Sequence, residues 1–512
     1  MATAPVAARG LGPVSADRAF FGHPGGLSTL FFTEMWERFS YYGMRGFLIL
    51  YMTAPMSAGG MGLDVAVAGP IYGAYTSMVY FMSLPGGWLA DRLLGQRRAV
   101  VGGGILIAAG HYSLAIPWAS TFYLGLVLIV LGTGLLKPNV SVIVGQLYAQ
   151  NDIRRDAGFS IFYMGINLGA TIGPLITGFL AQQPQFQQWL GAHGFDPRSA
   201  WHFAFGAAGV GMTFGVVQFL LGTRALGTAG AEPTGTPDQQ RSARTIALLG
   251  AAVIVALIAI VATGFVPVTP KQVADAIGYM LVLVTIPFFG WLLFSSSWTP
   301  VERGRLWVIL VLFLAVALFW SIFEQAGSTL NLFADRSTNN VLPLYGAFPS
   351  SWFQSLNSAF IIIFAPVFAW LWIRLGDQQP NVPTKFALGL VGAGMGFLIL
   401  IPAANLAATG VKVSVLWLTL TYLLHTWGEL SISPVGLSAM TKLAPARIVS
   451  LIMGVWFLGA SVGNYLGGQM ASLYSSMPLS TLFGVVGAFG LACAALMFAF
   501  TKPLTKLMGG VR

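Results

Sequence analysis

The chain has 512 residues, of which 56% are apolar and only 8% are charged. Soluble domains carry about 25% charged residues, so this composition excludes a water-exposed globular surface, and the high apolar content excludes a disordered chain. At about 20 residues per crossing, the apolar content is sufficient for about 14 transmembrane helices, and we expect an all-α integral membrane protein. The net charge is +10, and the lone Cys493 excludes a disulfide or cysteine-based metal framework.

Apolar runs of spanning length follow one another along the whole chain. They lie at about 27–51, 65–90, 98–117, 121–148, 159–181 and 201–222, then at 244–265 and 274–295, then at 304–332, 352–374, 384–404, 413–440, 447–475 and 479–501. This pattern predicts a cytoplasmic N-terminal segment (1–26), an N-terminal six-helix bundle (27–222), a cytoplasmic linker (223–243), an inserted helix pair (244–295), a C-terminal six-helix bundle (304–501) and a cytoplasmic tail (502–512). The inserted pair has uncharged cores, so we expect it to be peripheral.

The distribution of basic residues indicates the orientation of these helices. Three basic residues fall within the apolar runs and four fall on one side of the membrane, whereas all the others fall on the opposite side. The first set is Arg38, Arg45 and Lys137, and the second is Arg198, Lys271, Arg336 and Lys412. Lysine and arginine concentrate in cytoplasmic loops, so both termini are predicted to be cytoplasmic. The net charge is then a topology signal, and we expect no nucleic-acid partner.

The first apolar run contains an unusual row of charged and aromatic residues. Spacings of three and four place these side chains along one stripe of a helix: Glu34, Glu37, Arg38, Tyr41, Tyr42 and Arg45. A charge at the bilayer centre costs about 2.5–3.5 kcal/mol, so the stripe must face other charges or water. One interpretation is an ion pair that only holds the helix in place. However, Arg45 has no carboxylate within a turn of its own helix and needs a partner elsewhere.

Three further charges lie in other apolar runs without an opposite charge nearby in the sequence. Lys137 belongs to the first half of the chain, whereas Glu324 and Glu429 belong to the second. Two cations in one half and two anions in the other predict ion pairs across the interface between the halves. Such an ion pair could be permanent and only hold the two halves together. It becomes a gate if the halves rock about their interface, so that the pair forms in one state and breaks in the other.

The two halves also resemble each other in sequence. Glycines at positions 169, 173 and 178 recur at 459, 463 and 468, in the fifth run of each half. Convergent packing of small residues is one explanation, since such residues let helices approach closely in lipid. A parallel duplication of six helices explains in addition why both segments are fifth in their set.

Several other functions lack the residues that they need. No catalytic nucleophile with a base, no His-Glu-x-x-His zinc motif and no Walker-type phosphate loop occurs, so we expect no enzyme, no metal site and no ATP hydrolysis. Of the five histidines only His425 lies inside an apolar run, and we expect it to be a packed, neutral residue.

Known families share several of these motifs. The loop 87–98 between the second and third runs, with Asp91, Arg92, Arg97 and Arg98, resembles the loop signature of the major facilitator superfamily. The segments 34–42, 134–141, 162–169, 323–331, 352–357 and 428–436 resemble motifs of the proton-dependent oligopeptide transporter (POT) family. The resemblance implies a major facilitator fold and uptake of di- and tripeptides driven by the inward proton gradient, across the cell inner membrane. It implies no cofactor other than the coupling proton.

Residue chemistry and the resemblance together suggest roles for individual side chains. Arg45 and Lys137 could hold the carboxylate of a peptide, and Glu324 its amino group. The resemblance adds further peptide-binding residues: Tyr41, Tyr42, Tyr80, Tyr163, Asn167, Trp320, Asn357, Ser433 and Trp456. Proton coupling is assigned to Glu34, Glu37, Arg38 and Lys137. The hypothesis for gating is an outer pair, Arg45–Glu324, and an inner pair, Lys137–Glu429.

Two departures and two alternatives accompany the resemblance. Ser358 follows Asn357 where the family often has proline, and no histidine occupies the second run, so proton transfer must rest on carboxylates. One alternative is a facilitator-fold proton symporter for another small solute, such as nitrate or a drug-like metabolite. A more remote one is a peptide receptor that does not transport. Besides peptide and protons, we expect membrane lipids as partners, and a monomer as the working unit.

Overall fold

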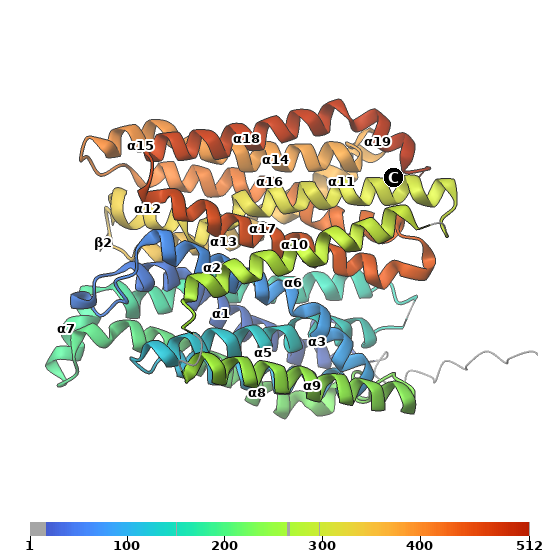
Figure 1. The fold of residues 1–512 in the computed structure, drawn as a ribbon, viewed down its shortest axis with the longest axis horizontal. Coiled ribbons are helices and arrows are strands. Elements are labelled where there is room, and N and C mark those ends of the chain that lie inside the picture. Colours follow the sequence, from blue (N-terminus) through green and yellow to red (C-terminus); the bar gives the residue numbers. More distant parts are fainter. Residues whose placement is uncertain (1–16, 150, 264–266, 296, 511–512) are drawn as a thin grey trace, which may run out of the picture.

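A computed structural model of the protein describes residues 17–510, except residues 150, 264–266 and 296. Most of these residues lie in helices that run roughly parallel to the long axis of the molecule (Figure 1). Ten helical segments among them are long and apolar enough to cross a membrane. The other four predicted runs are helical as well, but they are shorter or contain more polar residues.

The N-terminal half contains the helices of the first six predicted runs. They are α1 (Gly26–Thr53), α2 (Val65–Phe81), α3 (Ser83–Leu89), the π-turn η3 (Ala90–Leu94), α4 (Gln96–Leu114), α5 (Ala119–Gln146), α6 (Arg155–Gln182) and α8 (Ala200–Gly222). Shorter elements connect them: η2 (Met56–Ala58), α7 (Pro184–Ala192), η4 (Pro197–Ser199) and η5 (Thr223–Leu226). The second run is therefore divided among α2, α3 and η3, and it begins at Asp64, whose carboxylate caps the Ala66 N–H at 2.7 Å.

The C-terminal half contains the helices of the last six predicted runs. They are α11 (Pro300–Phe323), η6 (Glu324–Gly327), α12 (Thr329–Ser337), α13 (Gln354–Leu375), α14 (Val382–Leu398), α15 (Leu400–Ala408), α16 (Val415–Leu443), α17 (Val449–Ala471), α18 (Leu479–Ala499) and α19 (Thr501–Leu507). Shorter elements are β1 (Val341–Leu342), β2 (Gly346–Ala347), η7 (Ser350–Phe353), η8 (Gly376–Gln378), η9 (Ala446–Ile448) and η10 (Ser472–Ser475). The antiparallel hairpin β1–β2 lies at the end of the bundle opposite the C-terminus (Figure 1), and we call this end the hairpin end.

The predicted apolar run at 304–332 lies within a segment apolar enough to cross the membrane, but it is not one continuous helix. Helix α11 ends at Phe323, and the turn η6 carries the chain into α12. The break lies where the C-terminal half meets the N-terminal half, because Gly327 lies directly against the Tyr72 hydroxyl and the Arg45 side chain. A side chain at position 327 would not fit beside these groups. The helix is interrupted at the very residue, Glu324, that carries the buried charge.

The repeated glycines occupy equivalent places in the two halves. Gly169 lies against the backbone of α1, and Gly463 lies in the same way against the backbone of α11, so the fifth helix packs on the first helix in each half. The last glycine of each set instead faces the other half: Gly178 contacts Ser351 of η7, and Gly468 contacts Gly73 of α2. This shared pattern supports a duplication, since chance packing would not reproduce both contacts.

The crossing of α2 and α17 is one of two long contacts between the halves. At Gly73, an added Cβ would stand 2.7 Å from the Cα of Gly468, so the two backbones touch. Near this contact the hydroxyls of Ser77 and Ser461 lie 2.8 Å apart. The second long contact joins α6 and α13. Both contacts use small or polar side chains, which suits an interface at which the halves move relative to each other.

The inserted helices α9 (Pro237–Ala262) and α10 (Pro270–Phe294) lie outside the two halves. Helix α9 begins at Pro237, seven residues earlier than the boundary expected from the apolar run, because the polar residues before it are also helical. It packs against η3 of the N-terminal half. Helix α10 slants across the front of Figure 1 and contacts α2 as well as α11 and α17. The pair therefore spans the junction between the halves from the outside.

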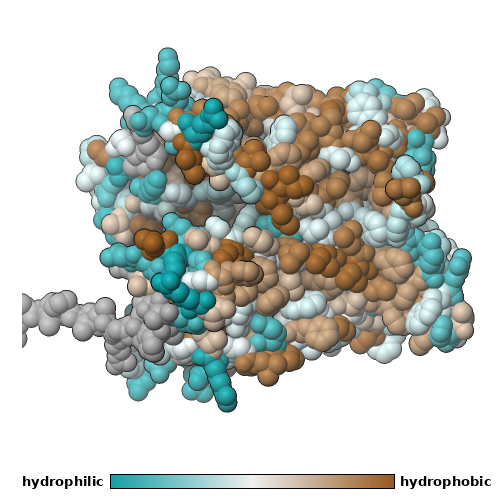
Figure 2. All heavy atoms as spheres, turned by 180° about the vertical axis from the view of Figure 1, so that it is seen from behind, coloured by the Kyte–Doolittle hydropathy of each residue, from teal (hydrophilic) through white to brown (hydrophobic). Residues whose placement is uncertain are grey.

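The outer surface of the bundle is apolar between two polar ends. Figure 2 shows this belt on one face, with hydrophilic residues gathered at both ends of the helices. Large apolar side chains are exposed along it, such as Leu283 at 71%, Phe294 at 78% and Ile373 at 81%. Apolar surface of this extent would not remain exposed in water, so the belt is the part of the molecule that lies in the membrane.

Candidate functional site

The charged stripe of α1 forms a compact, buried ion cluster. The Nε atom of Arg38 lies 3.0 Å from Oε1 of Glu34 and 2.5 Å from Oε2 of Glu37, and all three residues are at most 3% exposed. Two carboxylates thus share one guanidinium, so the cluster holds one negative charge in excess unless a carboxylate carries a proton. Oε2 of Glu34 and Oε1 of Glu37 are buried without a hydrogen-bond partner among the described residues. The cluster is therefore suited to take up and release a single proton.

One predicted ion pair across the two halves is present. The Arg45 guanidinium on α1 contacts the Glu324 carboxylate in η6, and both residues are 3% exposed. The Nε atom of Arg45 also donates a hydrogen bond of 2.7 Å to the Tyr72 hydroxyl on α2, which fixes the direction of the guanidinium. A helix of the N-terminal half is thereby tied to the C-terminal half at the turn that ends α11.

Further hydrogen bonds close the interface toward the hairpin end. Asn331 of α12 donates to the Gly46 carbonyl at 2.7 Å. Gln182, at the end of α6, donates to the Ser350 hydroxyl at 2.9 Å and accepts from the Ser351 N–H at 3.1 Å. The Trp352 indole donates to the Leu175 carbonyl at 3.0 Å. These contacts join the halves on the hairpin side of the Arg45–Glu324 pair.

The other predicted ion pair is not formed in the described structure. The Lys137 ammonium lies 4.0 Å from the centre of the Tyr80 ring, in a cation–π contact. Glu429 accepts a hydrogen bond of 2.9 Å from the side-chain amide of Asn357, which also donates to Thr426 at 3.1 Å. Lys137 lies within electrostatic range of Glu34, Glu37 and Glu324. It therefore belongs with the acidic groups of α1 and η6 in this conformation.

The tyrosines assigned to peptide binding lie around these charges. Arg38 stands 5.5 Å from the ring centre of Tyr41, and Arg45 stands 5.6 Å from that of Tyr42. Tyr163 is 41% exposed and lies within electrostatic range of Tyr42 and Glu429.

The remaining residues predicted to bind peptide lie in different surroundings. Asn167 is buried on α6 and donates a hydrogen bond of 3.0 Å to the Tyr163 carbonyl. Trp320 packs edge-on against Phe323, and its indole nitrogen is buried without a partner in the described part of the chain, as is the Ser433 hydroxyl. Trp456, by contrast, packs into the C-terminal half against Gly436. Its contact with α16 places it in a helix–helix contact of that half.

Sequence reasoning missed several polar residues of this cluster. Gln354 of α13 donates to the Ala326 carbonyl at 2.6 Å and to the Tyr422 hydroxyl at 2.9 Å. It therefore supports the turn that carries Glu324. Tyr72, Gln354 and Tyr422 are all buried. Their signal in the sequence was a polar side chain inside an apolar run, which is weaker than the signal of a charge.

No group of three or more potential metal ligands occurs among the residues that the structure describes. The charged groups at the interface form ion pairs and hydrogen bonds with one another instead. Their arrangement, with cations on α1 and α5 and carboxylates on η6 and α16, fits a small solute that carries both charges.

Comparison with known proteins decides the family. The family model described as POT family matches residues 97–490. The chain belongs to the POT family. It is 41% identical to the peptide transporter YePEPT of Yersinia enterocolitica, with 97% of both chains covered. It is 38% identical to a di-/tripeptide transporter of Lactococcus lactis subsp. cremoris, with 97% of this chain and 99% of the relative covered.

Solved structures of the family have the same fold. A crystal structure of the peptide transporter POT in complex with sulfate matches with a TM-score of 0.87 at 43% identity, over 96% of this chain and 97% of that one. A POT family transporter in complex with 5-aminolevulinic acid matches with a TM-score of 0.85 at 35% identity, over 95% and 98%. The resemblance drawn from the motifs is confirmed, and the protein is a multi-pass membrane transporter, not an enzyme.

Proposed function

We propose that this protein takes up di- and tripeptides together with protons by alternating access. Relatives with 38–41% identity over nearly the whole chain are named peptide or di-/tripeptide transporters, which supports the substrate class. The observation that carries the proposal is the set of opposite charges at the interface between the halves. Arg45 and Lys137 provide cations, and Glu324 and Glu429 provide carboxylates, so a zwitterionic peptide can bind with each end on an opposite charge.

The proton enters this scheme through the α1 cluster. Glu34 and Glu37 compete for Arg38, so protonation of one carboxylate leaves a single neutral pair in the apolar environment. Release of that proton restores the excess negative charge, and Lys137 lies within electrostatic range of it. Proton binding therefore changes how strongly α1 attracts Lys137, which links the proton to the movement of the halves.

The outer and inner pairs act as alternating gates in this scheme. Contact between Arg45 and Glu324, with the hydrogen bonds around it, supports a closed hairpin end. Separation of Lys137 from Glu429 supports an open opposite end. The described conformation then corresponds to the inward-facing state, with the hairpin end on the outside. A peptide that binds Arg45 and Glu324 would weaken the outer pair and favour reopening.

The proposed topology has fourteen crossings, with both termini in the cytoplasm. It keeps the six-helix bundles at 27–222 and 304–501, the linker, the inserted pair and the terminal segments. The bias of basic residues toward one side supports the orientation. We further propose a monomer in the cell inner membrane, surrounded by lipid.

Uptake into liposomes tests the proposal. Purified protein should accumulate a labelled dipeptide when the outside is acidic, and should only equilibrate it without a proton gradient. Glu37→Gln should abolish accumulation, whereas Asp64→Asn, a control at an exposed helix cap, should retain it. Accumulation by Glu37→Gln equal to that of the wild type would contradict the coupling role. In Lys137→Ala, proton-driven uptake should be lost while peptide exchange remains.

A second candidate substrate is a smaller solute with an amine and a carboxylate. The related transporter solved with 5-aminolevulinic acid motivates this alternative. Competition by 5-aminolevulinic acid, nitrate and drug-like compounds against the labelled dipeptide separates the candidates. Stronger competition by any of these than by unlabelled di- or tripeptides would overturn the peptide assignment. Binding without pH-dependent flux would indicate a receptor.

A further inference from the structure

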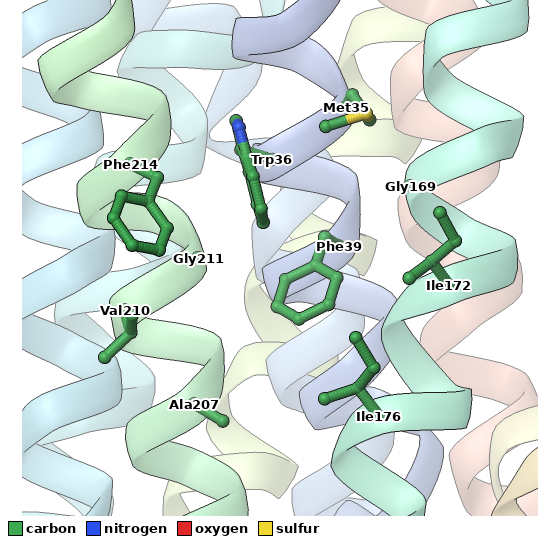
Figure 3. Close-up of a pocket in the computed structure, with 10 residues that line it drawn as sticks. All are labelled: Met35, Trp36, Phe39, Gly169, Ile172, Ile176, Ala207, Val210, Gly211 and Phe214. Atoms are coloured by element: carbon green, nitrogen blue, oxygen red, sulfur yellow. The ribbon is translucent and has the colours of Figure 1, made fainter.

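A groove runs along the outer face of the bundle between α1, α6 and α8, away from the charged interface. Its inner part has a volume of about 370 Å³ and only apolar lining surface, from residues including Phe39, Ile176, Ala207 and Phe214 (Figure 3). Gly211 on α8 forms part of the groove wall and lets α8 lie close to Phe39, since an added Cβ would collide with the Phe39 ring. Phe214 and Ile176 are 54% and 46% exposed, so the groove opens to the surroundings of the bundle.

A second hollow continues this groove toward the end of the bundle where α8 terminates. It has a volume of about 690 Å³ and shares Trp36 and Phe214 with the apolar part, but Ser28, Gln218 and Gly222 give it polar surface. Along α1 the combined groove extends from residue 28 to residue 39, which at 1.5 Å per residue is about 16 Å. One leaflet is half of the roughly 30 Å hydrocarbon core, so the groove has the length of one leaflet.

Unpaired donors lie at the boundary between the apolar and polar parts. In Figure 3 the indole nitrogen of Trp36 points away from Phe39 and Ile176. Trp36 also lines the polar part of the groove. No hydrogen bond is recorded for this nitrogen among the described residues. Gln218, which also lines the polar part of the groove, accepts from Thr33 through Oε1 at 3.1 Å and so has its amide N–H groups left as donors. Indole N–H groups at this depth commonly bond the ester region of lipids.

Charge at the polar end selects an anionic headgroup. Arg224 is exposed in η5, two residues after Gly222 of the groove wall. A phosphate at this end would pair with the exposed guanidinium of Arg224.

We infer that the α1/α6/α8 groove binds one glycerophospholipid with an anionic headgroup. Its acyl chain lies between Phe39, Ile176 and Phe214, its ester region accepts from Trp36 and Gln218, and its phosphate contacts Arg224. The lipid would then support the outer face of α1, whose inner face carries Glu34, Glu37 and Arg38. Binding does not depend on which solute the protein carries.

Native mass spectrometry with dioleoylphosphatidylglycerol tests this inference on the delipidated full-length protein. The wild type should bind a first lipid at least tenfold more tightly than the next ones. Ala207→Phe should remove this first step by filling the groove, and Arg224→Gln should weaken it at least tenfold. Leu283→Phe, which enlarges an exposed apolar side chain on α10, should leave it unchanged.

Three results would overturn the inference. The first is the absence of a distinct tight step in the wild type, which would indicate only general lipid coverage. The second is equal binding by Ala207→Phe and Leu283→Phe. The third is equally tight binding of dioleoylglycerol, which lacks the phosphate. Because Arg224 is exposed and lies outside the helices of the core, its variant remains informative if Ala207→Phe does not fold.

Discussion

The two predicted ion pairs across the halves differ in the described conformation. Arg45 and Glu324 are in contact, almost fully buried, and surrounded by hydrogen bonds between the halves. Lys137 and Glu429 are partly exposed, and each contacts an uncharged group instead. Lys137 lies over the Tyr80 ring, and Glu429 accepts a hydrogen bond from the Asn357 amide. A charge on each side of an interface therefore does not require pairing at all times. Each of the two charged side chains instead needs another partner in the state in which the pair is separated.

The largest difference between the pairs should appear in stability. Arg45→Met would leave Glu324 buried without its cation, which costs about 3–5 kcal/mol. Lys137→Met removes a partly exposed cation that has no ion pair here but contacts the Tyr80 ring, and should cost only about 0.5–2 kcal/mol. Thermal unfolding in detergent measures both, and Arg198→Met, which removes an exposed ion pair, is the control. Equal destabilisation by Arg45→Met and Lys137→Met would contradict the difference seen in the structure.

A double variant sharpens the same comparison. Arg45→Met combined with Glu324→Gln removes both charges, so the double variant should recover about 1–4 kcal/mol relative to Arg45→Met alone. The corresponding double variant Lys137→Met with Glu429→Gln should be additive, since the two side chains do not touch. Unfolding free energies of the four single variants and the two double variants provide the coupling energies. Strong coupling between Lys137 and Glu429 would show that the inner pair forms in the dominant state.

A smaller effect is expected at the residue that orients Arg45. Tyr72→Phe removes the hydrogen bond to Arg45 and leaves the ring in place, at a cost of about 1–2 kcal/mol. A less firmly held Arg45 should raise the KM for peptide more than it lowers the maximal rate of uptake. Tyr75→Phe is the matched control, because the Tyr75 hydroxyl has no hydrogen-bond partner among the described residues. A pure loss of maximal rate would argue against a positioning role.

The smallest effect is expected at a partly buried ion pair in the loop between α5 and α6. Hydrogen bonds from Arg154 lower the pKa of Asp152 to about 2. The stabilisation from this lowered pKa is complete above the ordinary value of 3.8 and is lost only as the pH falls toward 2. Asp152→Asn should therefore leave the pH profile of uptake between pH 5 and 8 unchanged. A shifted profile would mean that groups outside the α1 cluster contribute to coupling.

The sequence alone determined the class of protein and the residues that matter most. Low charge and long apolar runs require a helical membrane protein, because lipid cannot satisfy exposed backbone or charges. The charged stripe of α1 and the isolated Lys137, Glu324 and Glu429 stand out for the same reason. Since a charge in lipid is costly, each one that persists marks a functional or structural need. The motifs around them identified the family.

Only the tertiary structure decided which charges meet. Arg45 and Glu324 are 279 positions apart in the chain, and their pairing remained a hypothesis until the packing of α1 against η6 brought them into contact. The same packing leaves Lys137 and Glu429 with other partners in this conformation. The break of the run at 304–332, the support from Gln354 and the groove behind α1 likewise arise from contacts between distant helices. Apolar periodicity places a residue on a face of its own helix, but the packing of neighbouring helices decides what that face touches.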